Sequence, residues 1–114
     1  IIGVFANRQP CFDDDLNGQL ADFEKIFSGR QVCFVGDLNI TFSGRPWPSN
    51  KARQTLVDAF KNYGLTNTTA NIADTVDHIV LSNDFIKNKH LEIETWNTDK
   101  KLSDHVGHSL ALTQ

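Results

Sequence analysis

A short, unbroken apolar run constrains the fold of this chain more than any other feature. Residues 32–35 read Val-Cys-Phe-Val and lie between Gly29 and Gly36. Because apolar residues fill successive positions instead of alternating ones, the run predicts a strand that is covered on both faces. Such a strand needs layers of other elements around it, so the sequence predicts an α/β (or α+β) fold.

The rest of the chain supplies elements for those layers. Asp13 to Asp15 suit the N-terminus of a first helix, as cap and as partners of its dipole, and Ser49 suits the cap of a second. Gly29 and Gly64 are expected to end these helices. In order, we expect strand 1–6, helix 16–27, strand 32–35, helix 49–63, a polar loop 65–74, and strands 75–82, 91–96 and 109–113. This order predicts one mixed sheet with helices on at least one face.

Composition excludes several classes of protein. The 114 residues are enough for one domain, and no apolar stretch approaches the ~18 residues of a membrane span. The net charge of −3 argues against a protein that grips duplex nucleic acid mainly through a basic face. Only Cys11 and Cys33 are present, so we expect no disulfide framework and a reducing, cytoplasmic setting. The chain lacks Met and opens on an apolar run, so we expect it to be a piece of a longer protein.

Three polar segments interrupt the apolar strands. They read Gly-Asp-Leu-Asn at 36–39, Val-Asp-His-Ile at 76–79 and Ser-Asp-His at 103–105. The strand that ends at the first segment is expected to bring Asp37 to the sheet edge, with Asn39 on the same side by the strand period of two. A carboxylate inside an apolar strand, as at Asp77, costs several kcal/mol unless something binds it. Taken singly, the segments also fit an Asx turn, a satisfied core histidine (His78) and a simple turn.

Together, in this order, the three segments resemble the motifs of the endonuclease/exonuclease/phosphatase superfamily of metal-dependent phosphoesterases. The resemblance extends over residues 1–114 and implies the C-terminal half of a four-layer α/β/β/α sandwich, with one mixed sheet and its helices on the outer face. It implies that a partner half, normally carrying the metal-binding glutamate, packs on the inner face. We therefore expect that the chain associates with that missing half, pairs with a second copy or is a product of proteolysis, and that the isolated chain has little or no activity.

The resemblance also implies roles for individual residues. Asp37 would orient and help to deprotonate the attacking water, and Asn39 would bind the phosphate or fix Asp37. His105 would contact the scissile phosphate as a cation, with Asp77 as its orienting carboxylate. Asp104 would belong to the shell of a Mg²⁺ ion, for which Mn²⁺ could substitute. The implied substrate is a phosphoester, with nucleic acid as one candidate.

Other residues have weaker claims. Trp47, between two prolines, would either stack on a base or sugar or anchor its loop by packing on the surface, and Asn7 would donate to a phosphate. Trp96 either packs on the fold or edges the same cleft. The remaining candidates are expected to be solvated or structural: the loop cations Arg8, Lys100 and Lys101, the acids Glu24, Glu92 and Glu94, and a zinc set of His78, Asp104, His105 and His108. The competing function is a non-catalytic half-domain that serves as a binding or assembly surface.

Overall fold

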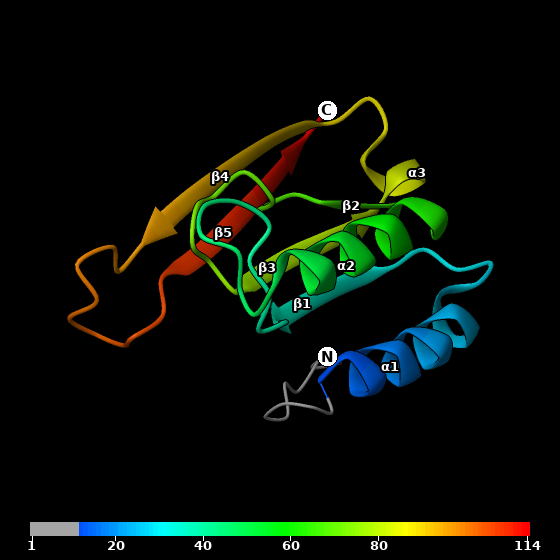
Figure 1. The fold of residues 1–114 in the computed structure, drawn as a ribbon. Coiled ribbons are helices and arrows are strands. Elements are labelled where there is room, and N and C mark those ends of the chain that lie inside the picture. The colour runs from blue at the N-terminus through cyan, green and yellow to red at the C-terminus, as the bar shows by residue number, and fades with distance from the viewer. Residues whose placement is uncertain (1–11) are drawn as a thin grey trace.

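The computed structural model describes residues 12–114 (Figure 1). Helices and strands are both present, and the architecture is α+β. The elements follow the order α1 (Phe12–Phe27), β1 (Cys33–Asp37), α2 (Asn50–Asn62), β2 (Leu65–Asn67), β3 (Asp77–Ser82), α3 (Asn83–Ile86), β4 (His90–Trp96) and β5 (Gly107–Thr113). No helix in this range is long and apolar enough to cross a membrane.

The strands form two small antiparallel sheets. In the first, β3 lies between β1 and β2, with Phe34 opposite Val80 and Asp37 opposite Asp77. In the second, β4 pairs with β5 from His90 opposite Thr113 to Trp96 opposite Gly107. The hairpin of β4 and β5 lies away from the two long helices (Figure 1).

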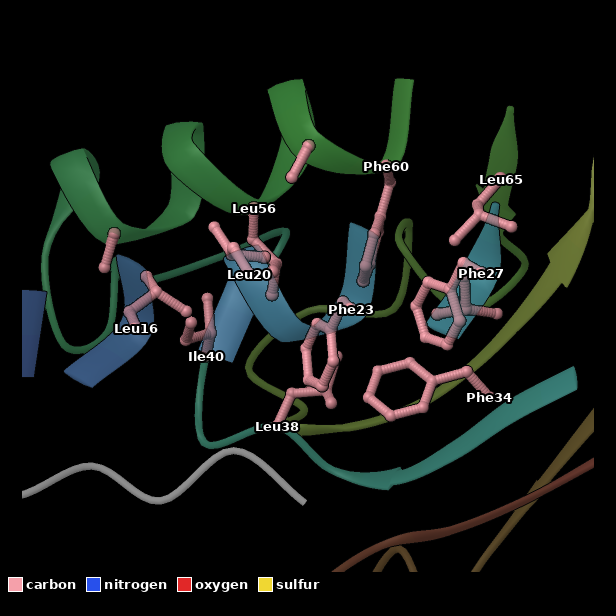
Figure 2. Close-up of a cluster of buried hydrophobic side chains, with 13 residues drawn as sticks. Leu16, Leu20, Phe23, Phe27, Phe34, Leu38, Ile40, Leu56, Phe60 and Leu65 are labelled. Carbon is pink, nitrogen blue, oxygen red and sulfur yellow. The ribbon is translucent and has the colours of Figure 1, made fainter. Parts of the chain in front are cut away.

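Both long helices cover one face of the three-stranded sheet. Their apolar sides meet the sheet in one core, and the phenylalanine rings pack edge-to-face, tilted or stacked at centroid distances of 5.3–6.5 Å. Figure 2 shows α2 above this cluster and the strands below it. The core consists of Leu16, Leu20, Phe23, Phe27, Phe34, Leu38, Ile40, Ala52, Leu56, Ala59, Phe60, Leu65 and Val80. This packing fixes β1 and β3, the two strands that carry Asp37 and Asp77.

The predicted helix boundaries are largely confirmed. The Ser49 side chain accepts a hydrogen bond of 3.1 Å from the backbone N–H of Ala52, as expected of an N-cap. The first helix begins at Phe12, so Asp14 and Asp15 lie in its first turn instead of capping it. There they still face the positive end of the helix dipole.

Removal of the α2 cap should destabilise the fold. Ser49→Ala leaves the N–H of Ala52 without its side-chain acceptor, and we expect the free energy of unfolding in urea to fall by about 1 kcal/mol. Ser28→Ala is the matched control, because Ser28 is exposed just beyond the end of α1. Equal losses in the two variants would contradict the capping role.

Two expectations about the sheet are wrong. The predicted mixed sheet is replaced by two antiparallel sheets in the described part of the chain, because the chain turns back after β2 and enters β3 antiparallel to both of its neighbours. The predicted coverage of 32–35 on both faces also fails within residues 12–114. Cys33 is exposed and Val35 is 36% exposed, since both long helices pack on the Phe34 side.

Short elements went undetected in the sequence. The predicted loop 65–74 contains β2, whose three residues Leu-Thr-Asn are too few to show a period. Helix α3 is a single turn and likewise shows no period. The predicted strand 1–6 lies outside the described residues, as does Cys11, while Cys33 has a free thiol.

Candidate functional site

The pairing of β1 with β3 brings Asp37 and Asp77 side by side. Asp37 is the last residue of β1 and Asp77 the first of β3, and the antiparallel register places them directly opposite each other. Directly opposed residues have Cβ atoms about 4.5–5.5 Å apart and project to the same face of the sheet. Two carboxylates from segments 40 residues apart in sequence therefore share one sheet edge.

The segment before β5 adds His105 to this edge. Nδ1 of His105 lies 2.5 Å from Oδ2 of Asp77, a charge-assisted hydrogen bond. Ligand atoms of Asp37, Asp77 and His105 all lie within 4.8 Å of one another. Each of the three polar segments thus contributes one residue to a single cluster.

Electrostatics favour the charged form of this histidine. The hydrogen bond that His105 donates to Asp77, followed by the negative charge of Asp77, raises the pKa of His105 above its usual value, and Asp37 and Asp104 act in the same direction. Because Nδ1 is held by Asp77, the ring presents Nε2 away from that carboxylate. Nε2 makes no hydrogen bond within residues 12–114, and in the protonated ring its N–H can donate to an anion.

Asn97 organises the loop that carries His105, and sequence analysis missed it. Its side-chain amide donates to the carbonyl oxygens of Ser103 and His105, at 3.0 and 2.6 Å, and its Oδ1 accepts from the N–H of Leu102 at 2.9 Å. Asn97 has a φ of 59°, a conformation that asparagine tolerates in turns. An asparagine directly after an alternating strand was the available signal.

Asp37 closes an Asx turn. Its Oδ1 accepts a hydrogen bond of 2.7 Å from the N–H of Asn39, which leaves Oδ2 available to a ligand. Asn39 has a φ of 56° and follows the end of β1. The strand period on which we placed Asn39 beside Asp37 therefore does not extend to it, and its link to Asp37 is through the backbone.

The remaining predicted site residues stand further out. The side chain of Asp104 is 95% exposed and outside the cluster, although its Oδ1 is 3.9 Å from Nε2 of His105. Trp47 is 51% exposed in the loop after β1, where its carbonyl oxygen accepts from the N–H of Thr41 and its N–H donates to the hydroxyl of Thr41. Asn7 and Arg8 lie outside the described residues. The acids Glu24, Glu92 and Glu94 are exposed, as expected.

Two hollows flank the Asp77–His105 pair, and both are lined by these two residues. The larger, of about 370 Å³, reaches Val35 on the open face of the sheet and Trp96 at the end of β4. The smaller, of about 290 Å³, reaches Lys100 in the β4–β5 loop. The pair therefore stands between a mainly apolar hollow and one of mixed polarity, each open to a ligand.

A still larger hollow, of about 680 Å³, lies at the other end of the β1–β3 ladder, beside Gln31 and Ser82. Its charged lining residues are Glu24, Arg30 and Asp84. It contains no member of the Asp37, Asp77 and His105 cluster. Its size alone therefore does not make it the candidate site.

The zinc set is not assembled. His78 is 2% exposed on the core side, where Nε2 donates to the carbonyl of Ile40 and Nδ1 accepts from the side-chain amide of Asn67, so it is a satisfied core histidine. Burial lowers its pKa and keeps it neutral. His108 bonds to Thr75 at 2.8 Å, and burial lowers its pKa as well.

No protein-family model, no curated protein and no solved structure matches this chain. The case for a function therefore rests on the residues of the site.

Proposed function

We propose that this chain supplies the Asp37, Asp77 and His105 side of a metal-dependent phosphoesterase site, nuclease-like and active in the intact parent protein. The observation that carries the proposal is the meeting of these three side chains within 4.8 Å, from segments far apart in sequence. The motif resemblance supports it independently of the geometry. On this proposal the chain is the C-terminal half of a four-layer sandwich, and the missing half packs on the exposed face around Val35.

The polar residues of the site fit Mg²⁺ if carboxylate oxygen binds the ion and His105 binds the substrate. Mg²⁺ is held in many enzymes by one or two carboxylates together with water and substrate phosphate. Asp104, beside the smaller hollow, would hold it, while Oδ2 of Asp37 is left to the attacking water. Asp77 raises the pKa of His105 and so favours the protonated ring, which acts as a donor instead of a ligand. Mg²⁺, or Mn²⁺ in its place, would polarise the phosphoryl oxygen and offset its charge.

The chain's own residues divide the remaining work. Asp37 accepts a proton from the water that attacks phosphorus, while the Asx turn holds its carboxylate in place. Asp77 fixes the imidazole of His105 through Nδ1, so that Nε2 donates to a non-bridging phosphoryl oxygen. The positive charge of His105 then stabilises the negative charge that builds up on these oxygens.

Hydrolysis of a generic phosphodiester by the parent protein tests this proposal. We expect turnover of bis(4-nitrophenyl) phosphate with Mg²⁺ or Mn²⁺, and a rate no faster than the buffer blank when a chelator is in excess. Metal-independent turnover would contradict the metal assignment. Absence of turnover under all metal conditions and with several phosphoesters would favour the non-catalytic binding module.

A further inference from the structure

Trp96 has an unusual position next to the Asp77–His105 pair. It is the last residue of β4 and pairs directly with Gly107, the first residue of β5. A Cβ atom at Gly107 would lie 2.2, 2.3 and 2.5 Å from three atoms of the indole. Because these distances are nearly equal, the ring lies with one face against the backbone of Gly107. Glycine is required there, since any side chain would displace the ring.

The other face of the indole is exposed. Trp96 remains 56% exposed although one face is covered by Gly107, so the exposed area belongs to the second face and the ring edges. An aromatic side chain is common opposite a glycine on the neighbouring strand, because its ring shields the glycine backbone. This shielding does not explain why a residue as large as tryptophan leaves so much apolar area in water.

This exposed indole lines the larger hollow, which His105 also lines. Val35, Ile79 and Val106 make the walls beside the indole apolar, and the polar lining residues are Asp77, Ser103 and the histidines. An indole face beside apolar walls suits a flat, unsaturated ring, and His105 suits a phosphate attached to that ring.

We propose that Trp96 stacks on the base of a nucleotide whose phosphate lies at His105. The inference deepens the proposed function, on which it rests for the position of the phosphate, and it names the substrate as a nucleotide or an unpaired nucleic acid strand. Stacking on a base needs no extended basic face, which agrees with the net charge of −3. Lys100, in the smaller hollow beyond the pair, is placed to meet the next phosphate of a strand.

Tryptophan fluorescence of the 114-residue chain tests the stacking directly. The chain has two tryptophans, so Trp47→Phe leaves Trp96 as the sole reporter, and Trp96→Phe is the matched variant that leaves Trp47. Each is titrated with adenosine 5′-monophosphate and with ribose 5-phosphate, which lacks the base, in the presence of Mg²⁺. We expect saturable quenching only for Trp96 and only by the nucleotide. In the Trp47→Phe background, His105→Ala should weaken that binding about 10-fold.

Kinetics of the parent protein give a second, independent measurement. Trp96→Leu should raise KM for a dinucleoside phosphodiester by about 10- to 100-fold and change KM for a ring-free alkyl phosphodiester by less than about threefold. Trp96→Phe should retain most of the effect of the indole, because phenylalanine also stacks. A purely structural role would lower kcat for both substrates alike.

The outcomes separate the two proposals. Equal quenching by both ligands, quenching of Trp47 alone, or equal losses on both substrates would overturn the stacking inference and leave the phosphoesterase proposal standing. Base-dependent quenching of Trp96 without any hydrolysis would support stacking and count against the enzyme.

Discussion

Replacement of Asp37 by asparagine, or of His105 by alanine, is expected to abolish phosphodiester hydrolysis by the parent protein, with a fall in kcat of about 10³-fold or more. Asparagine keeps the shape of Asp37 and can still accept from the N–H of Asn39, but it cannot take a proton from water. Alanine at position 105 removes the donor that Asp77 orients and leaves that carboxylate, only 27% exposed, without its partner. Initial rates at saturating Mg²⁺ measure both losses.

Matched controls distinguish chemistry from a general loss of charge. Asp58 and His90 are exposed, on α2 and at the start of β4, and neither lines a hollow beside the cluster. Asp58→Asn and His90→Ala are therefore expected to keep rates within about twofold of the parent. If Asp37→Asn and His105→Ala kept parental rates as well, the enzymatic assignment would be wrong.

The long elements could be predicted because each carries many periodic positions. The apolar residues from Leu16 to Phe27 and from Ala52 to Phe60 recur on one helix face, and the same residues are buried in the core. The sequence could not show how strands pair. Antiparallel and parallel neighbours share the same side-chain period, so the opposition of Asp37 and Asp77 needed the register of β1 with β3.

Only the three sequence motifs predict that Asp37, Asp77 and His105 come together. Strand ends direct Asp37 and Asp77 to an edge, but nothing in periodicity brings the loop at 103–105 to the same edge. That loop is held by the amide of Asn97, and a single asparagine carries too little pattern to identify such a role. The apolar residues around Val35 likewise predict that this face of the sheet is buried, but they do not show which segment buries it. Within residues 12–114 the face is exposed.

Asp77→Asn is expected to lower the rate by about 10²-fold and to change its pH dependence. Asp77 raises the pKa of His105 by hydrogen bonding and by its charge, so the histidine stays protonated above its ordinary pKa of about 6.5. Asparagine removes the charge, the pKa of His105 falls, and the neutral form appears at lower pH. The alkaline limb of the pH–rate profile should therefore move to lower pH, and the variant should lose more activity at pH 8 than at pH 6.

The sign of this shift separates an orienting carboxylate from a metal ligand. If Asp77 mainly bound the metal, Asp77→Asn would raise the Mg²⁺ concentration needed for half-maximal rate, and excess Mg²⁺ would restore activity without moving the alkaline limb. If it mainly holds His105, saturating Mg²⁺ leaves the defect in place, because the lost interaction is the 2.5 Å bond between Oδ2 and Nδ1. Profiles recorded at two Mg²⁺ concentrations, with Asp58→Asn as the control, decide between the two roles.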